Sequence, residues 1–581
     1  MRIKTSILCA ITAAASLECG AQSLNKEITV ERDIVPEYRD AERLKLTPGI
    51  SLPAIQKKKL NYSLVDRPVG VTPVIYPLGL QPPVVNIGEN YRGYAAIGYM
   101  PMFNLAASAG YRFVDTESTK ADAWLQYNGR AYHSDVTMDS KSWIPEDPGI
   151  VEEKMFRNNT VTIGASLMQV TGERSALNAF ADYTYSRYSM VDCPFETVYK
   201  IFNQGVNRFN LAADWSHRDK ENISYGIDAS YSRFAFISPK YEVYDRYGEN
   251  NLFTMLANKE NHFDFGIFGD AALGGGSYFG FDVDFSYLHN NFNTHLSNSS
   301  SSFSEDHRYY RTDAQNTWLL RLTPSYRFIS GDFTADLGAR IDLTHGAGKA
   351  FHIAPDVKIG FKTSQYFSAQ LSFGGGEVQN SLASLFDVSP YMLPYFSYKN
   401  SHIPFTGDLK ATIGPFSGAY IELFGGYARA NDWLMPSAGD NSYSPVNIRG
   451  WHGGVAAGYR HGTLGEVRVS LERATHGDKA NLQNGYYLWR DRAKYVIEAS
   501  GKVTPVEKLD ITASYECRSG RHDSYRNLGT VSLFDLGAAY RFTPRFTVFV
   551  NGENLLNRKY TYIGAVPSQG ITGLAGITYK F

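Results

Sequence analysis

Aromatic side chains in long connections are the residues of this sequence best suited to binding chemistry. The segment from Val378 to Pro404 is unusually apolar for a connection between predicted strands. Aromatic clusters on loops bind ligands or partner surfaces, but they also pack on neighbouring segments. A tryptophan in a loop can likewise stack on the face of a sugar or simply pack. The candidates for a ligand-binding or partner-binding loop are Trp143, Tyr391, Tyr395, Phe396, Tyr398 and Trp433.

Catalytic chemistry has no comparable set of residues. Covalent hydrolysis needs a nucleophile and a base that converge at one place, and no local arrangement singles out such a pair. Four histidines fall near the same connections, but a solvated or hydrogen-bonded histidine is the ordinary case. The two cysteines that lie beyond the first 21 residues, Cys193 and Cys517, have no metal-ligand spacing. These histidines are His262, His289, His295 and His307. We predict that the protein is not an enzyme and has no catalytic residue, cofactor or metal site.

The elements that must position these residues are strands with alternating side chains. In the stretch after Gly276, every second residue is apolar, while the residues between are small or acidic. The apolar set is Phe279, Phe281, Val283, Phe285 and Tyr287, and the other set is Gly280, Asp282, Asp284 and Ser286. Lipid suits the first face and a water-filled lumen suits the second. A soluble β-sandwich would also alternate, so this pattern leaves two fold classes open.

Connection lengths decide between the two classes. Short turns, such as 171–174 and 330–332, alternate with mostly long connections, such as 132–157, 238–260 and 290–314. A sandwich has no reason to sort its connections in this way, whereas a transmembrane barrel has short periplasmic turns and long extracellular loops. We therefore predict an all-β fold, an antiparallel transmembrane β-barrel of about 22 strands. It would lie in the outer membrane of a Gram-negative bacterium with both termini in the periplasm.

Charged residues fall on the faces that are predicted to line the lumen. A barrel this wide would enclose water unless its loops or its N-terminal segment fold inward. Lumen walls are polar in any case, and acid–base pairs on them can form a structural network. The charged positions include Asp228, Asp264, Asp282, Asp284, Arg468 and Glu472.

The N-terminal part divides into a signal and an arm. Residues 1–21 have a basic start, an apolar core and small residues before a cut near Gln22, as secretory signal peptides do. Residues 22–90 are rich in proline, which predicts an extended periplasmic segment that is either a tether or a docking strip. Residues 91–581 form the predicted barrel. The formal net charge of −1 gives no reason to expect a nucleic-acid partner.

The end of the chain resembles a known family. Residues 533–542 (LFDLGAAYRF) and 546–560 (FTVFVNGENLLNRKY) are similar to the last hairpins of TonB-dependent receptors. The closing residues 576–581 (GITYKF) resemble the terminal strand that the barrel-assembly machinery recognises. The resemblance implies an assembly signal that includes Gly576, Tyr579 and Phe581, with Leu574 at a position that is usually polar.

A missing plug is the main departure from that family. TonB-dependent receptors normally carry a large folded plug ahead of the barrel, and residues 22–90 are too few to form one. The resemblance implies a plug-less, receptor-like barrel for transport or passage of solutes across the outer membrane. The alternative is an outer-membrane anchor that docks envelope components through its loops and its periplasmic arm. The implied partners are outer-membrane lipid, the barrel-assembly machinery and a periplasmic or surface protein.

Overall fold

A computed structural model gives the fold of the C-terminal five-sixths of the chain. It describes residues 91–581 with gaps, so the predicted signal (1–21) and arm (22–90) lie outside the described residues. The gaps are 101–103, 139–149, 193–199, 220–221, 238–239, 245–249, 255–257, 292–315, 347–349, 365, 389, 392–398, 437–442, 463–464, 477–492, 523–526 and 561–566.

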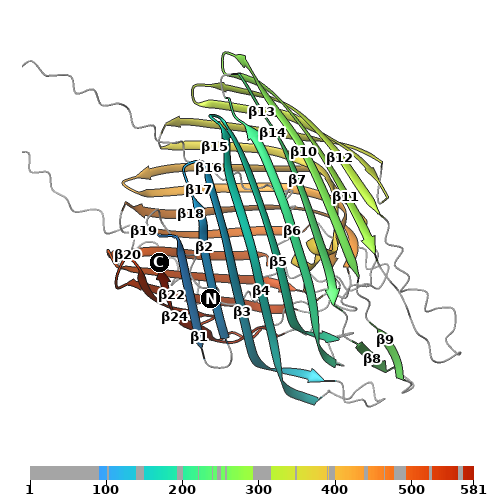
Figure 1. Cartoon of the computed structure of the whole chain (residues 1–581), viewed down its shortest axis with the longest axis vertical. Coiled ribbons are helices and arrows are strands. Elements are labelled where there is room, and N and C mark those ends of the chain that lie inside the picture. Colours follow the sequence, from blue (N-terminus) through green and yellow to red (C-terminus); the bar gives the residue numbers. More distant parts are fainter. Residues whose placement is uncertain are drawn as a thin grey trace, which may run out of the picture. The chain divides into compact units, whose positions relative to one another are not determined.

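The described elements are nearly all strands (Figure 1). Their bounds are β1 (Gly93–Met100), β2 (Asn104–Asp115), β3 (Thr119–Met138), β4 (Ile150–Gly172), β5 (Ser175–Asp192), β6 (Lys200–His217), β7 (Ile223–Ile237), β8 (Lys240–Tyr244), β9 (Asn250–Thr254), β10 (Lys259–Gly274), β11 (Ser277–Asn291), β12 (Thr317–Ser330), β13 (Phe333–His345), β14 (Phe351–Ser364), β15 (Phe367–Val378), α2 (Leu382–Val388), β16 (Ser401–Phe416), β17 (Ala419–Pro436), β18 (Tyr443–His461), β19 (Gly465–His476), β20 (Tyr495–Val506), β21 (Leu509–His522), β22 (Asn527–Arg541), β23 (Phe546–Glu553) and β24 (Thr572–Lys580). No helix among the described residues is long and apolar enough to cross a membrane.

The strands form one closed antiparallel barrel. Its sheet has 22 strands, and β8 and β9 pair separately as a two-stranded sheet. The barrel closes because β1 pairs with β2 on one side and with β24 on the other. Closure leaves no open sheet edge, which is the condition for a sheet to sit in hydrocarbon. The predicted fold class and strand number are confirmed.

The two ends of the barrel differ in their connections. The start of β1 and the end of β24 lie at one end, together with short turns such as 173–174 and 331–332. We call this the turn end and the opposite one the loop end. The longer connections, including 238–258 and 379–400, lie at the loop end. Both termini of the barrel are thus on the side of the short turns, as the sequence predicts.

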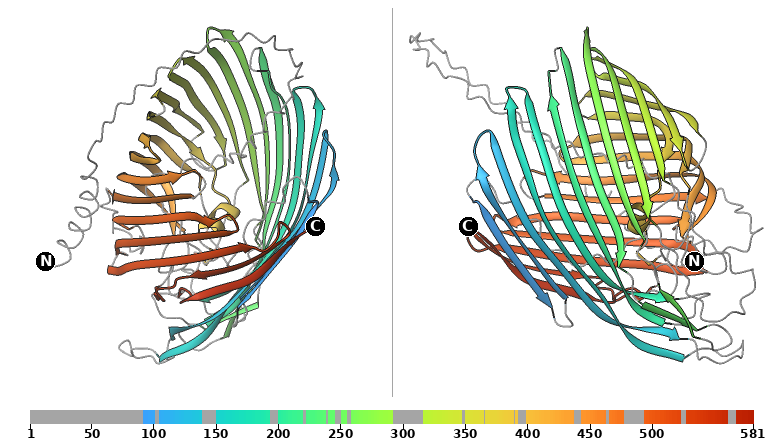
Figure 2. Two further views of the ribbon diagram at one scale, coloured as in Figure 1. Left: turned by 90° about the vertical axis from the view of Figure 1, so that its left-hand side faces the viewer. Right: turned by 45° about the vertical axis from the view of Figure 1, so that its right-hand side comes forward.

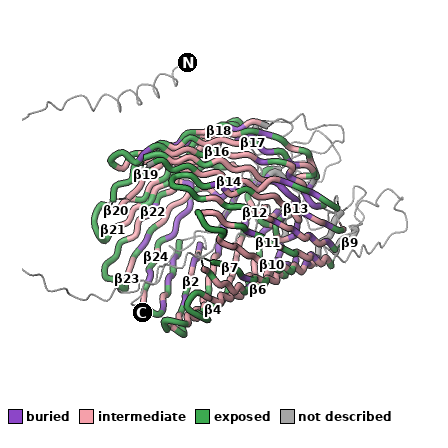
Figure 3. Tube along the Cα trace, turned by 90° about the horizontal axis from the view of Figure 1, so that it is seen from above, coloured by how far each residue is buried: buried purple, intermediate pink, exposed green. Residues whose placement is uncertain are grey.

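The outer face of the barrel carries the apolar side chains. In β10, Phe263, Phe265 and Ile267 are each about half exposed, and Ile421 and Leu423 in β17 are similar. Exposed residues are interspersed with less exposed ones along the strands (Figure 3). Because exposed apolar side chains at every second position suit lipid, the alternate residues face the lumen.

Aromatic rings gather near the turn end. Tyr366 stacks on Phe416 with ring centroids 5.2 Å apart, and Tyr540 lies edge-on to Phe542 at 4.8 Å. These rings lie within a few residues of the short turns and are mostly exposed. Barrels place such a girdle at a membrane interface, where a ring can contact lipid and water together.

Several strands extend farther at the loop end than the sequence analysis expects. The connection expected over 132–157 is reduced, because β3 and β4 stay paired up to Met138 and Ile150. Trp433, which we expected in a loop, instead lies in β17 after a register shift. The apolar alternation ends where the lipid ends, but backbone pairing continues beyond it, so the pattern understates strand length.

The predicted assembly signal lies on β24, the strand that closes the barrel, and on Phe581 directly after it. The Tyr579 and Phe581 side chains are 44% and 50% exposed, and the Phe581 carbonyl accepts hydrogen bonds from two β1-side amides. A Cβ on Gly576 would come within 2.2 Å of the Ile97 carbonyl oxygen, so no side chain fits there. Leu574 is buried against Phe549. Recognition of this strand by the assembly machinery stays a prediction.

Candidate functional site

A short helix interrupts the connection between β15 and β16, where the sequence analysis expected only a loop. Ser381 and Ser384 cap it reciprocally: the Ser384 amide donates to Ser381 Oγ at 3.0 Å, and the Ser381 amide donates to Ser384 Oγ at 2.9 Å. This exchange satisfies amides that a helix start leaves without partners. Leu382 and Leu385 are buried. We call the described residues 379–391, with α2 at their centre, the α2 segment.

The α2 segment lies inside the ring of strands (Figure 2). Its polar contacts come from strands that are distant in sequence. Glu260 of β10 accepts a hydrogen bond from the Leu382 amide at 2.5 Å, and Arg208 of β6 donates to Asp387 at 2.7 Å. On another strand, β18, the Tyr443 hydroxyl donates to the Leu385 carbonyl at 2.5 Å. The segment is therefore tied to several parts of the inner wall.

Aromatic packing holds the same segment. The Phe386 ring lies 5.2 Å from the ring of Phe234 and 5.9 Å from that of Tyr188. Tyr391 is 6% exposed and lies edge-on to Tyr188, with ring centroids 6.1 Å apart. This burial raises the pKa of the Tyr391 phenol, because a phenolate would lose its hydration there. The apolar character of the connection is thus used, at least in this part, for packing inside the barrel.

The six predicted binding residues are only partly described. Tyr391 belongs to the buried packing of the α2 segment, and Trp433 lies half-buried in β17. Trp143, Tyr395, Phe396 and Tyr398 lie outside the described residues. Binding of a ligand or partner by these six residues stays a prediction.

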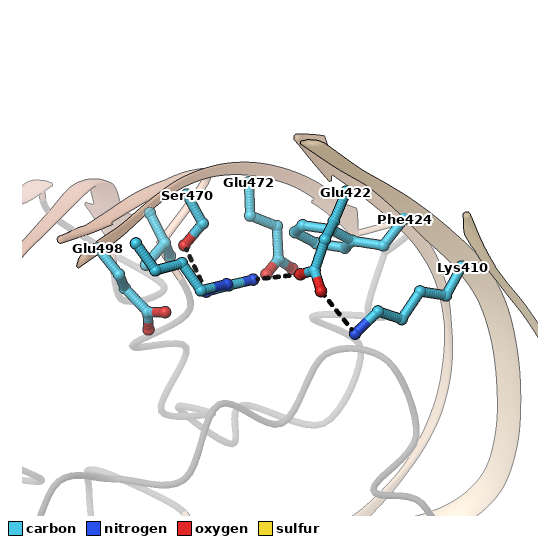
Figure 4. Close-up of a pocket in the computed structure, with 8 residues that line it drawn as sticks. Lys410, Glu422, Phe424, Ser470, Glu472 and Glu498 are labelled. Atoms are coloured by element: carbon cyan, nitrogen blue, oxygen red, sulfur yellow. Dashed lines mark hydrogen bonds and ion pairs between the residues drawn. The ribbon is translucent and has the colours of Figure 1, made fainter. Parts of the chain in front are cut away.

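A second candidate site is a charged recess on the inner wall of β16–β20 (Figure 4). Its volume is about 250 Å³. Glu422 lies at its centre, where one carboxylate oxygen is 3.0 Å from Lys410 Nζ and the other accepts from Arg468 Nη2 at 3.1 Å. Glu422 faces inward because Ile421 and Leu423, on either side, are exposed on the outer face. We call this site the inner recess; its lining is Lys410, Glu422, Phe424, Arg468, Ser470, Glu472, Val496 and Glu498.

Further charged groups extend the inner recess along the wall. His452 Nδ1 is 3.2 Å from Glu472, and its Nε2 is 3.4 Å from Asp408. Toward the turn end, Glu466 accepts a hydrogen bond from the Tyr420 hydroxyl at 2.7 Å. Two larger recesses, of about 600 and 700 Å³, lie near the same wall and share Arg468 or Lys410 with the inner recess. A polar solute would meet both signs of charge along this surface.

Part of this wall follows from the sequence. The alternation of side chains places Arg468 and Glu472 inside, and the structure confirms that both line the inner recess. The alternation alone does not identify Lys410 and Glu422 as their partners. The available signal is that they alternate with apolar residues on neighbouring strands, but a single sequence does not fix which strands align in register.

Comparison of the fold with solved structures identifies its type. A ferric enterobactin receptor variant of Pseudomonas aeruginosa matches with a TM-score of 0.63 at 11% identity, over 86% of this chain and 82% of that one. The FrpB iron transporter of Neisseria meningitidis matches with a TM-score of 0.62 at 12% identity, over 85% and 82%. The siderophore receptor PirA of Acinetobacter baumannii gives 0.60 at 11%, over 84% and 80%. The barrel has the fold of TonB-dependent receptors. No protein-family model and no curated protein sequence matches the chain.

The receptor-type barrel differs from the expected family pattern inside its lumen. Among residues 91–581, as far as they are described, there is a barrel with an inward-folded α2 segment and no plug domain. With its apolar outer face and closed sheet, the protein is an outer-membrane β-barrel of receptor type.

Proposed function

We propose that the barrel passes small polar solutes across the outer membrane and that the α2 segment is its constriction. The observation that carries this proposal is the charged inner wall, which has the inner recess and two larger recesses. The α2 segment folds inward at the loop end of the same lumen. Water-filled lumens are lined in this way, whereas the outer face is apolar. The fold type agrees, because the three solved structures compared above are named as receptors or transporters.

The α2 segment is suited to move because it is not part of the sheet. It is held by single hydrogen bonds, such as the one to Tyr443, by the ion pair of Arg208 with Asp387 and by the packing of Phe386. Each net hydrogen bond contributes only about 0.5–1.5 kcal/mol. Because the α2 segment is not paired with any strand of the barrel sheet, displacing it would leave all barrel strand pairs intact.

Conductance in a planar lipid bilayer tests this role. The wild-type protein should give small or infrequent currents, and the double variant Phe386→Ala, Asp387→Ala should give larger or more frequent ones. Asp122→Ala is the matched control, because it removes a carboxylate paired with Arg112 near the turn end, which lines none of the three recesses and lies away from the α2 segment. Equal currents from all three proteins would contradict a constriction at α2.

Silence of every variant would instead favour the anchor. In that function the barrel only fixes the protein in the membrane, and the loops or the arm (22–90) bind envelope components. The inward-folded α2 segment is the observation that favours it, because it occupies the lumen at the loop end. Capture of envelope proteins by the full chain, but not by a chain lacking 22–90, would support docking.

We also infer that the turn end faces the periplasm, since short turns lie there in outer-membrane barrels. Labelling of intact cells that carry a single cysteine in the connection 292–315 tests this orientation, because that loop should react with an impermeant reagent. A cysteine in the turn 331–332 should not react.

A further inference from the structure

Three side chains that can ligate a metal converge at the loop end of β14–β16. Glu377 and His402 are directly opposite each other in the register of β15 and β16, and His352 joins them from β14. Glu377 Oε2 lies 3.2 Å from His352 Nε2 and 3.4 Å from His402 Nδ1. These three ligand atoms all lie within 4.8 Å of one another. We call this set the His–Glu–His cluster.

The cluster faces the interior of the barrel. Phe351 and Ile353, on either side of His352, are 57% and 62% exposed on the outer face, so His352 points inward. Glu377 and His402 contact His352 and therefore share that side. The side chains of His352 and Glu377 are 5% and 1% exposed, whereas that of His402 is 21% exposed. The cluster is thus buried except at His402.

The distances between the ligand atoms fit tetrahedral coordination of a divalent cation. Zinc binds histidine nitrogen at about 2.0–2.1 Å and carboxylate oxygen at about 2.0–2.2 Å, which puts neighbouring ligand atoms of a tetrahedron about 3.3–3.5 Å apart. The two contacts to Glu377 are close to that edge length. The imidazole rings are stacked, with centroids 3.9 Å apart and planes at 29°. The more exposed His402 can tilt to point its lone pair at a shared ion.

Two atoms of the His–Glu–His cluster lack a hydrogen-bond partner in the described part of the chain, and a bound ion could take the place of that partner. Glu377 Oε2 and His402 Nδ1 are buried atoms that have no hydrogen-bond partner among the described residues. A buried carboxylate oxygen without a donor costs free energy, because it has lost its water. A cation between the carboxylate and the imidazoles would satisfy these atoms together.

The backbone of Glu377 is held firmly by its neighbours. Its amide donates to Asp342 Oδ2 at 2.6 Å, and its carbonyl accepts from Arg321 Nη2 at 2.7 Å. Arg321 and Asp342 also pair with each other, at 2.8 Å. Such outer contacts orient the ligands of metal sites and keep them in position.

We propose that the His–Glu–His cluster binds one divalent transition-metal ion of the zinc type. Two imidazoles and one carboxylate are borderline ligands that suit zinc and its neighbours better than calcium or magnesium. Three protein ligands leave a fourth position for water or for a donor atom of a solute. The bound ion links three consecutive strands at the point where the chain enters and leaves the α2 segment.

Metal titration of the full-length protein without a histidine tag tests the proposal. After removal of metal with a chelator, the wild type should bind one equivalent of Zn²⁺ more than Glu377→Gln. Co²⁺ as a probe should give visible absorption bands typical of tetrahedral coordination. These bands should be lost in Glu377→Gln and in His402→Gln, with affinity at least about tenfold weaker.

The matched control is His452→Gln. His452 also lies between two carboxylates on the inner wall, at 3.2 and 3.4 Å, but it lies beside the inner recess and not in the cluster. This variant should keep the Co²⁺ bands and the full zinc stoichiometry. The migration of unboiled samples on gels confirms that each variant is folded, and His402→Gln is the variant least expected to disturb folding, because its side chain is the most exposed of the three.

The results separate the proposal from its alternative. If Glu377→Gln and His402→Gln bind as much metal as the wild type with unchanged Co²⁺ bands, the cluster is not a metal site. If folded wild-type protein binds no metal, the three residues form only a buried histidine–carboxylate contact. Neither result depends on whether the barrel conducts solutes.

Discussion

Two charged groups on the inner wall of the barrel differ in their access to water. At the loop end, Arg321 and Asp342 pair with side chains that are 8% and 1% exposed. In the inner recess, the side chains of Lys410 and Glu422 are 54% and 13% exposed. Buried charges depend on their protein partners because water is excluded, whereas exposed charges are partly neutralised by solvent.

The hydrogen bonds of the two regions differ in the same direction. Arg321 donates to both oxygens of Asp342, at 2.8 and 3.1 Å, and to the Glu377 carbonyl at 2.7 Å. Arg468 in the inner recess donates to Glu422 at 3.1 Å and to Ser470 at 3.4 Å. Arg321 makes three hydrogen bonds and its pair with Asp342 is shielded from water, so the pair stabilises the fold. The arrangement in the inner recess is looser and open to the lumen, so a solute can compete for its groups.

Substitution of Arg321 should have the largest effect on stability. Arg321→Met leaves the Asp342 carboxylate buried without its cation, which should lower the free energy of unfolding by about 3–5 kcal/mol. The measurement is urea unfolding in lipid vesicles, followed by tryptophan fluorescence and gel migration. The midpoint should move to clearly lower urea concentration.

A double variant checks that charge burial is the cause. Arg321→Met with Asp342→Leu removes both charges and should recover part of the lost stability, because two apolar groups can replace a buried pair. If the double variant is as unstable as the single one, packing rather than an unpaired charge explains the loss.

A buried but uncharged contact at the loop end separates burial from charge. Tyr443→Phe removes the hydroxyl that donates to the Leu385 carbonyl in α2. Leaving that carbonyl unsatisfied should loosen the α2 segment by about 1 kcal/mol, or about fivefold in the population of its open form. Limited proteolysis between β15 and β16 measures this change.

Tyr420→Phe is the corresponding control on the open wall. The Tyr420 hydroxyl donates to Glu466 at 2.7 Å, but Glu466 also pairs with Arg460 and is accessible to water. Its loss should leave cleavage between β15 and β16 unchanged. Equal acceleration by both variants would mean that burial does not distinguish the two regions.

Much of the barrel can be predicted from the sequence, because contact with lipid requires apolar side chains at every second position of a strand. The alternation of Phe263, Phe265 and Ile267 in β10 depends only on local pattern, and the structure places all three on the outer face. Closure also follows, because a sheet in hydrocarbon has no open edge. These features need no knowledge of contacts between distant residues.

The interior could not be predicted in the same way. The α2 segment takes its inward position from Glu260, Arg208 and Tyr443, which belong to three strands far apart in the chain. The His–Glu–His cluster combines residues about 25 positions apart through strand register and a bulge near Gly376. A single sequence does not specify register to one residue, and a shift of one residue would turn Glu377 to the other face.

Neutralising Glu422 in the inner recess should have the smallest effect on stability and a clear effect on ion selectivity. Glu422→Gln weakens pairs with two cations whose side chains are 54% and 34% exposed, so the free energy of unfolding should change by about 1 kcal/mol or less. It removes the carboxylate between Lys410 and Arg468, so the lumen becomes more positive there. In a variant with a loosened α2 segment, the reversal potential in a KCl gradient should therefore shift toward anions. Lys410→Gln should shift it toward cations, since it leaves the carboxylate in excess.

Shifts of the same sign in both variants, or a loss of stability as large as that of Arg321→Met, would contradict the distinction between an open, solute-accessible wall and a buried, structural one.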